Sequence, residues 1–475
     1  MVLQRAPERA ILWGYASVIN DRVIVLMNGI QVAETTVVQD SNNKGVWKVK
    51  LPAESKPGPF EINISSSEGS FSLSDVMFGD VWLCSGQSNM DFRMSQVNNS
   101  AAEIDDSVAY RDVRMLFSKL VQSNTTVDDV QVNTPWIYPI EGVVDKFSAL
   151  CFMFGRNLQK HLGYPIGLIE SSWGGTRIEV WSSPTAINSC SGTSPKPVKF
   201  PQIPADNGVL WNSMIHPYLS MTIKGAIWYQ GESNSGRFDL YKCQFPAMIN
   251  DWRQQFHSAS DGETNSQFPF GFVQLAPYRN LSDSTALAGL RWSQSTNIGY
   301  VPNVNMPNTF MAVAIDLPDV NSPYGSVHPR YKQDIAARLA LGARNVAYGE
   351  HNVVFQGPFP TSYQTDHAQN LLTITFDNGT SHLQVNSNDG FEVCCKGQNC
   401  NAWNVWTPST INSHTDSTVS IDVSGCHGAQ VISLRYLWRE SPCKLKDCPL
   451  YSSHTMLPVP PFELKDLIHS TSIIG

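Results

Sequence analysis

The sequence predicts an α/β protein in which a parallel sheet with flanking helices lies between two β-rich domains. From about residue 79 to residue 350, short apolar segments alternate with helical stretches, which is the pattern of a parallel sheet covered by helices. Residues 1–78 and 351–475 instead show short Val- and Ile-rich segments separated by turn residues. We therefore expect three domains: a small β-domain at 1–78, an α/β domain at 79–350, and a β-rich domain at 351–475.

Five short apolar segments are the predicted strands of the central sheet. Two helices are expected between or after them. Residues 149–162 carry apolar side chains at four-residue spacing and end before Gly163, and residues 330–344 follow Pro329, a residue favoured at helix starts. The predicted strands are 80–84, 164–170, 224–229, 270–275 and 309–315.

The composition excludes several classes of protein. The 475 residues are 42% hydrophobic and 16% charged, as in a folded globular protein rather than a disordered one. The net charge is -8 and no basic stripe is present, which argues against a nucleic-acid partner. No apolar run approaches the ~20 residues that cross a bilayer, so we expect no membrane span.

Ten cysteines indicate disulfides and the secretory route. Zinc is disfavoured because the cysteines lack paired Cys-x-x-Cys spacing, so no metal is expected. The N-terminus, Met1-Val-Leu-Gln-Arg, lacks the features of a signal peptide, so the start is expected to be trimmed or internal. Asn-x-Ser/Thr triplets offer N-glycan sites in polar sequence at Asn63, Asn98, Asn124, Asn280 and Asn378.

Chemistry-bearing residues follow the predicted strands, where ligands bind in an open α/β sheet. The first strand leads into Ser85-Gly-Gln-Ser-Asn-Met, the second into Ser171-Ser-Trp-Gly-Gly-Thr, and the third into Gln230-Gly-Glu-Ser-Asn. The last is followed by Asp316, Asp319 and His328. A hydroxyl, an imidazole and hydrogen-bond donors are what acyl transfer needs.

Ser88 is the predicted nucleophile. It follows Gly86 at a strand-to-helix turn, where a residue without Cβ permits tight backbone geometry. Because position 90 is Met, the motif is not the Gly-x-Ser-x-Gly elbow of α/β-hydrolases, which implies another serine-hydrolase fold.

The segment Phe78-Gly-Asp-Val-Trp-Leu-Cys-Ser-Gly-Gln-Ser-Asn-Met resembles the first block of sialate O-acetylesterases. Trp173-Gly-Gly-Thr, Trp228-Tyr-Gln-Gly-Glu-Ser-Asn and Val327-His-Pro are similar to later blocks of that family. The resemblance spans essentially the whole chain. It implies an SGNH-type hydrolase core that removes O-acetyl esters from sialic acids, at the 9 position, in a lysosomal or secreted protein. No cofactor is implied.

The resemblance also implies roles for single residues. Ser88 would be the nucleophile and His328 the general base, with oxyanion donors from the N–H of Ser88, the N–H of Gly175 and a third-loop side chain. Gln230 and Asn234 compete for that last role. Loss of one such donor typically costs ~10²–10³ in rate.

The acid partner of His328 is open at this stage. SGNH enzymes usually carry an Asp three residues before the His, and this chain has Gly325 there. Asp316 or Asp319 could orient the imidazole, and a backbone carbonyl could do so instead, since a carboxylate and a carbonyl both fix its tautomer. We favour Asp316.

Other side chains near these loops have both a functional and a structural interpretation. Glu232 could organise the third loop or be simply solvated. Arg177 and Arg291 could each bind a sialate carboxylate or form an ion pair. A tryptophan ring near these loops could stack on a sugar, although such tryptophans more often lie in the core; the candidates are Trp173, Trp181 and Trp228.

Two rival functions remain. The chain could deacetylate another glycan, such as an acetylated polysaccharide, because the blocks concern the acetyl group rather than the sugar. It could also be a non-catalytic glycan-binding protein in which the end domains bind the sugar.

Overall fold

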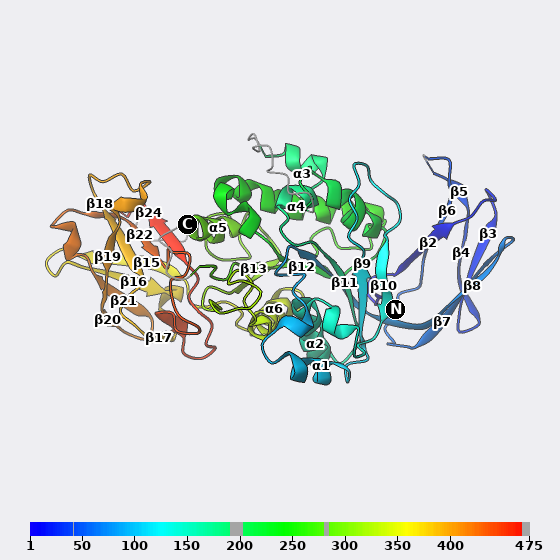
Figure 1. Ribbon diagram of the computed structural model, residues 1–475, viewed down its shortest axis with the longest axis horizontal. Coiled ribbons are helices and arrows are strands. Elements are labelled where there is room, and N and C mark those ends of the chain that lie inside the picture. The colour runs from blue at the N-terminus through cyan, green and yellow to red at the C-terminus, as the bar shows by residue number, and fades with distance from the viewer. Residues whose placement is uncertain (41, 191–202, 280–284, 468–475) are drawn as a thin grey trace. The chain divides into compact units, whose positions relative to one another are not determined.

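The computed structural model describes residues 1–40, 42–190, 203–279 and 285–467 (Figure 1). The chain divides into two compact units. Unit 1 comprises Met1–Trp228 and Ala247–Phe270, and unit 2 comprises Tyr229–Pro246 and Gly271–Gly475.

Unit 1 begins with short strands, drawn in blue in Figure 1. One antiparallel sheet contains β4, β3, β7 and the first half of β8, and a second contains β2, β6 and β5. Their apolar faces share one core that includes Val25, Ile62 and Phe78. The strands are β1 (Val2–Gln4), β2 (Ile11–Tyr15), β3 (Arg22–Met27), β4 (Ile30–Thr36), β5 (Val38–Gln39), β6 (Gly45–Lys50), β7 (Phe60–Ser66) and β8 (Gly69–Gly86).

One continuous strand joins these small sheets to the central sheet. β8 has 18 residues; its first half pairs with β7, and its second half pairs with β11. β1 also runs parallel to β8, with Leu3 opposite Phe78. The expected boundary after residue 78 therefore falls inside a strand.

The central sheet of unit 1 has the order β10-β9-β11-β8-β12. β11 runs parallel to both β8 and β9, whereas β10 is antiparallel to β9. β11 begins later than predicted because Pro165 has no N–H, and the ladder starts where Ile166 N–H bonds Asp112 O. The added strands are β9 (Val113–Ser118), β10 (Val132–Ile137), β11 (Ile166–Ser172) and β12 (Gly225–Tyr229).

The helix at 149–162 is confirmed as α2 (Ala149–Leu162). Ser148 caps it by accepting the Cys151 N–H at 3.1 Å, and Gly163 ends it with φ +73°. A disulfide between Cys84 and Cys151 joins α2 to β8. The other α-helices that begin before residue 240 are α1 (Ser100–Ser107), α3 (Pro184–Asn188) and α4 (Phe238–Ala259).

In unit 2, β13 (Phe270–Gln274) and β14 (Thr309–Val313) are neighbouring strands, and α5 (Ala286–Gln294) follows β13. The helix expected at 330–344 is α6 (Lys332–Val346). Pro329 precedes it rather than opening it, because Tyr331 is the N-cap residue. Its predicted apolar stripe is buried at Ile335, Leu339 and Ala343.

The C-terminal part of unit 2 is β-rich, as predicted. Its sheets have the orders β15-β16-β21-β20, β19-β18-β22-β24 and β17-β23. The strands are β15 (Pro360–Asp366), β16 (Leu371–Phe376), β17 (Leu383–Val385), β18 (Phe391–Cys395), β19 (Thr407–Ser409), β20 (Ile411–His414), β21 (Thr418–Asp422), β22 (Val431–Tyr436), β23 (Leu450–Ser452) and β24 (Phe462–Lys465).

The cysteines form disulfides, which confirms that prediction. Three close short loops in the C-terminal part: Cys394–Cys400, Cys395–Cys426 and Cys443–Cys448. All ten cysteines lie in described segments and none is free. In the described part of the chain, we find no helix with the length and apolar character to cross a membrane.

Candidate active site

Ser88 lies in a tight turn directly after β8. Gly86 ends the strand with φ +142°, a conformation that side-chain-bearing residues rarely adopt. Gln87 O then accepts the N–H groups of Met90 and Asp91 at 2.8 and 3.0 Å. Ser88 itself is half-buried, so its hydroxyl stands at the end of a buried strand without being sealed off.

The loop after β11 lies against Ser88. The parallel register places Gly86 beside Ser172, so both loops start at the same edge of the sheet. Trp173 N–H donates to Gly86 O at 3.1 Å. A Cβ added to Gly174 would lie 3.3 Å from Ser88 Cβ. The structure thus brings Ser88 together with the segment that leads into Gly175, which has φ +76°.

Gln230 and Asn234 form one buried network in unit 2. Gln230 Nε2 donates to Asn234 Oδ1 at 2.7 Å, and Tyr241 Oη donates to Gln230 Oε1 at 3.1 Å. The loop is closed by Asn234 N–H, which donates to Gly231 O at 2.8 Å. Because Gln230 occupies Asn234 Oδ1, the Asn234 amide is oriented with its Nδ2 donors directed away from Gln230.

His328 is held by a backbone carbonyl. Its Nδ1 lies 2.7 Å from Tyr324 O, within a turn where Gly325 has φ +88° and His328 N–H donates to Gly325 O at 2.9 Å. A carbonyl only accepts, so Nδ1 carries the proton and Nε2 has the lone pair of a base. Burial lowers the pKa of His328, the bond to Tyr324 opposes this, and the Lys332 charge lowers the pKa further.

Asp316, the carboxylate favoured from the sequence, is engaged elsewhere. Both oxygens form a bidentate ion pair with Arg338, at 2.6 and 2.8 Å, and Tyr451 Oη donates to Oδ2 at 3.2 Å. Lys446 N–H also donates to Asp316 O at 2.7 Å. This fully buried carboxylate therefore ties the end of β14 to α6 and to the C-terminal segment, and Asp316 is replaced as the partner of the His328 ring by the Tyr324 carbonyl.

Asp319 is also bound by another residue, Arg330. Arg330 binds both of its oxygens, with Nε–Oδ2 at 2.6 Å and Nη2–Oδ1 at 3.0 Å, and Arg330 N–H donates to Oδ2 at 3.1 Å. This pair braces the segment on either side of His328.

Lys332 was not singled out from the sequence as a buried residue near the candidate site. The signal that could have revealed it is its position in line with the apolar stripe of α6. Its Nζ donates to Pro329 O at 2.7 Å and lies 5.3 Å from the centre of the Tyr229 ring. Complete burial lowers the pKa of Lys332 to about 7, opposed by the carboxylates of Glu232 and Asp319. The side chain thus connects the His328 segment to the residue that precedes Gln230.

A second unanticipated feature is a pair of buried carboxyl groups, Glu170 and Asp91, in unit 1. Ser172 Oγ donates to Glu170 Oε1 at 2.8 Å, and Glu170 Oε2 has no hydrogen-bond partner among the described residues. Burial and then the charge of Asp91 raise the pKa of Glu170, and burial raises that of Asp91. Like charges in a dry site favour one shared proton.

The arginines and tryptophans have largely structural roles. Arg291 is fully buried and donates to the carbonyls of Leu275, Arg439 and Glu440, so it is not available to a substrate carboxylate. Arg177 Nη2 donates to Ala205 O at 3.4 Å.

Trp181 and Trp228 are fully buried and meet edge to face, as core residues do, whereas Trp173 is half-buried.

Three of the possible glycan acceptors, Asn98, Asn124 and Asn378, are exposed, and Asn63 is partly buried on β7. Asn280 lies outside the described residues.

Two family models match the chain. The model described as "Carbohydrate esterase, sialic acid-specific acetylesterase" matches residues 78–330, and the "Sialate O-acetylesterase C-terminal domain" matches residues 361–466. The first covers the segments that contain Ser88 and His328 and more than half of the chain.

Characterised relatives and a solved structure agree with these matches. The chain is 42% identical to a sialate O-acetylesterase of Mus musculus, over 97% of this chain and 92% of the relative. It is 41% identical to one of Homo sapiens, over 97% and 90%. A carbohydrate acetylesterase structure from Xanthomonas citri has a TM-score of 0.80 and 29% identity, over 98% of this chain and 97% of that one. The resemblance seen in the sequence and the α/β class are confirmed, and the chain belongs to the sialate O-acetylesterase family.

Proposed function

We propose that this protein is a serine esterase that hydrolyses O-acetyl esters of sialic acids, at the 9 position, and releases acetate and free sialic acid. Membership of the sialate O-acetylesterase family supports the substrate class. The observation that carries the mechanism is the bond between His328 Nδ1 and Tyr324 O at 2.7 Å, because it leaves Nε2 as the basic nitrogen.

In the proposed reaction, Ser88 Oγ attacks the acetyl carbonyl carbon while His328 Nε2 takes the hydroxyl proton. The tetrahedral intermediate collapses to an acetyl-enzyme, and His328 returns the proton to the sugar oxygen that leaves. Water then attacks the acetyl group by the same route and releases acetate. The Tyr324 carbonyl keeps the imidazole in the required tautomer throughout.

The proposed oxyanion donors are the N–H groups of Ser88 and Gly175 and the Nδ2 of Asn234. Contact between Ser88 and the loop before Gly175 supports the first two. For the third, the direction of the hydrogen bond supports Asn234 over Gln230, because Gln230 Nε2 uses one of its two N–H groups to hold Asn234 Oδ1, which makes Nδ2 the donor side of the Asn234 amide. Gln230 is then a positioning residue, itself held by Tyr241.

The decisive experiment is acetate release from 9-O-acetylsialic acid by the wild type and by Ser88→Ala. We expect Ser88→Ala to lose at least about 10⁴ in kcat, as for other serine-hydrolase nucleophiles. Hydrolysis at the wild-type rate by Ser88→Ala would eliminate the mechanism, and sugar binding without hydrolysis by the wild type would favour the binding-protein alternative.

A second candidate substrate is an acetylated neutral polysaccharide. The similar structure from Xanthomonas citri is described as a carbohydrate acetylesterase, without reference to sialic acid. Acetate release from acetylxylan that is faster than from 9-O-acetylsialic acid would favour this alternative.

We also propose that the protein acts in a lysosomal or secreted setting. The disulfides support an oxidising folding environment. N-glycans are proposed at the acceptor triplets, and the exposure of Asn98, Asn124 and Asn378 supports modification there. The three expected domains are retained as a proposal, with β8 shared by the first two.

A further inference from the structure

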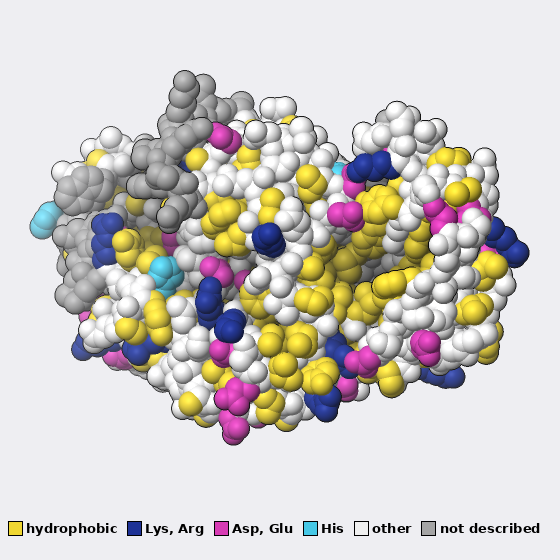
Figure 2. Space-filling view, turned by 45° about the vertical axis from the view of Figure 1, so that its right-hand side comes forward, with side chains coloured by type: hydrophobic (Ala, Val, Ile, Leu, Met, Phe, Trp, Pro, Cys, Tyr) yellow, Lys and Arg dark blue, Asp and Glu magenta, His cyan; other side chains and the backbone are white. Residues whose placement is uncertain are grey.

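A large cavity opens beside the N-terminal strands of unit 1. Its volume is about 890 Å³, and its walls come from β1, β2, β3, β6, β7 and β8, together with Leu116, Asp129, Val130, Trp136, Pro217, Tyr218, Met221 and Thr222. Figure 2 shows hydrophobic side chains gathered around a hollow on the side that carries the N-terminal strands in Figure 1. A cavity of this size matches the usual range for small-ligand sites, about 300–1,000 Å³.

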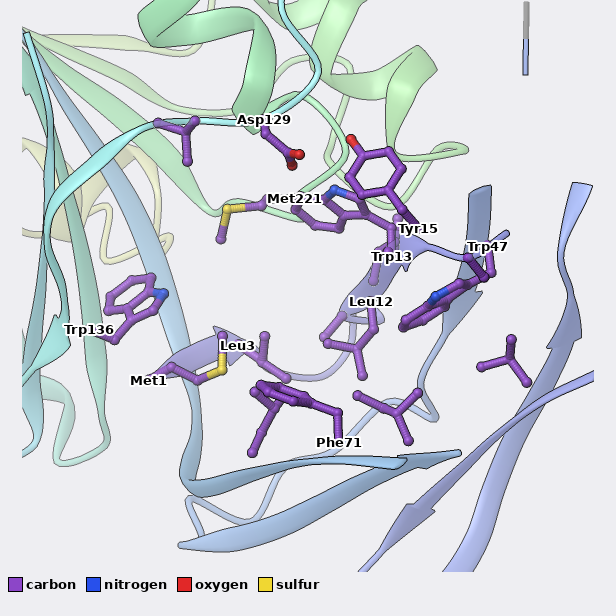
Figure 3. Close-up of a pocket in the computed structure, with 18 of the residues that line it drawn as sticks. Met1, Leu3, Leu12, Trp13, Tyr15, Trp47, Phe71, Asp129, Trp136 and Met221 are labelled. Carbon is purple, nitrogen blue, oxygen red and sulfur yellow. The ribbon is translucent and has the colours of Figure 1, made fainter. Parts of the chain in front are cut away.

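Aromatic rings form much of the wall. Figure 3 shows Trp13, Tyr15 and Trp47 on one side of the cavity and Trp136 across from them. The Trp47 ring lies flat over Gly14, since a Cβ added there would come within 2.7 Å of it. Phe71 is 63% exposed at the edge. Such a concentration of exposed aromatic surface is characteristic of a binding site rather than a core.

The charged side chains that line the cavity are carboxylates. In Figure 3 the Tyr15 hydroxyl points toward the Asp129 carboxylate, and burial followed by the Asp129 charge raises the pKa of Tyr15 to about 12. Glu68 accepts the Ser17 N–H at 2.8 Å. Among the described residues that line the cavity, no Lys, Arg or His side chain is present. The nearby Lys44 Nζ, 5.9 Å from the centre of the Tyr15 ring, is paired with Asp128 at 3.0 Å, so an anionic ligand would meet a rim in which carboxylates outnumber cations.

We propose that this cavity is a second carbohydrate site, which binds a neutral oligosaccharide and is separate from the esterase site. The apolar faces of pyranose rings stack on flat aromatic side chains, and sugar hydroxyls donate to carboxylates at the rim. Both elements are present, and the charge pattern selects neutral sugars over sialic acid itself. A purely apolar ligand would make no use of the hydrogen-bonding capacity of these carboxylates.

The cavity and the proposed esterase site have different lining residues. The cavity extends from Leu3, which pairs with Phe78, to Leu116, which is in register with Leu83 through Ile169. Neither Ser88 nor Gly175 is among the described residues that line it. The cavity therefore binds the neutral part of a glycan, or a neighbouring chain on the same surface, rather than the acetyl ester under attack.

The test is titration calorimetry of N-acetyllactosamine oligomers against the full chain carrying Ser88→Ala, so that binding is read without turnover. We expect saturable binding that weakens roughly tenfold in Trp47→Ala, through loss of ring stacking. Asp129→Asn, which changes only an exposed carboxylate, should also weaken binding. Ile30→Ala is the matched control, because Ile30 is 70% exposed in the same region and does not line the cavity.

Three outcomes would overturn this proposal. The first is no saturable binding of the neutral oligomer, and the second is binding by Trp47→Ala and Asp129→Asn that is as tight as with the intact cavity. The third is tighter binding of free sialic acid or of 1-octanol at the same cavity. Hydrolysis of 4-nitrophenyl acetate, measured in the same cavity variants with Ser88 intact, should be unchanged. Sugar binding and ester hydrolysis are thus separate readouts, and failure of either proposal is distinguishable from failure of the other.

Discussion

Lys332→Met should separate stability from activity in this protein. The fully buried ammonium group has a pKa of about 7 against an ordinary 10.5, which corresponds to about 5 kcal/mol against its charged form. Because the folded state binds fewer protons than the unfolded state between these pKa values, wild-type stability rises with pH through that window. The variant has no such group. Its stability relative to the wild type should therefore be several kcal/mol more favourable at pH 6 than at pH 10.

The esterase activity of Lys332→Met should be lower than that of the wild type. Lys332 Nζ donates to Pro329 O, next to His328, and lies over the Tyr229 ring, next to Gln230. Without this connection the imidazole loses its fixed position, and misplacement by about 1 Å can cost 10² in rate. We expect kcat to fall by about 10–100-fold. The acidic limb of the pH profile should move to higher pH, because the Lys332 charge no longer lowers the pKa of His328.

The assays are chemical unfolding at pH 6 and pH 10, and acetate release as a function of pH. Lys396→Met is the control, since Lys396 is exposed and its Nζ donates to the Gln430 side chain at 3.3 Å. If Lys332→Met kept the wild-type kcat and pH profile, Lys332 would have no positioning role. If its relative stability were the same at pH 6 and pH 10, the lowered pKa would be wrong.

Three further predictions concern the carboxylates and the third loop. Asp316→Asn should destabilise the fold by about 3–5 kcal/mol, because it leaves Arg338 buried without its anion. The folded variant should keep kcat within about tenfold of the wild type. A stable variant with kcat reduced about 10⁴-fold would restore Asp316 as the catalytic acid. Asn234→Ala should lower kcat by about 10²–10³ with little change in KM, and an unchanged kcat would exclude it from the oxyanion site. Wild-type stability should fall as pH rises through the raised pKa of Glu170, so Glu170→Gln should raise the melting temperature more at pH 8 than at pH 5; equal shifts at both pH values would contradict the shared-proton account.

The sequence predicted the elements that depend on local patterns. α2 has both a Ser cap and a Gly stop, and its predicted ends agree with the structure. The later strands of the central sheet lie within two residues of their predicted ends. β9 and β10 were missed, because their pairing partners lie far along the chain and their composition is mixed. The continuous β8 hid the domain boundary, since nothing in a strand's local pattern shows that its pairing partner changes halfway.

The partner of His328 could not be chosen from the sequence, and the reason is physical. Asp316 lies three residues after the end of β14, in the segment that leads to His328. Its role is decided by Arg338 in α6, which binds it in bidentate geometry. The carbonyl that replaces it belongs to Tyr324, and every residue has a carbonyl. The one local signal was Gly325, whose φ of +88° makes the turn that brings this carbonyl to the ring.

A carbonyl and a carboxylate orient a histidine equally well, yet they have different effects on its charge. A carboxylate stabilises the imidazolium and raises the pKa of the ring, whereas the carbonyl of Tyr324 has only a dipole, and burial together with the Lys332 cation lowers the pKa of His328. Neutral His328, the form that would accept the Ser88 proton in the proposed reaction, therefore persists to lower pH than an Asp-paired histidine would. The two buried carboxyl groups and Lys332 act on stability in opposite directions. The raised pKa values of Glu170 and Asp91 favour the folded state at low pH, whereas the lowered pKa of Lys332 favours it at high pH. The Tyr324 carbonyl, in place of an Asp at position 325, thus orients the ring of the proposed base and leaves it neutral to lower pH.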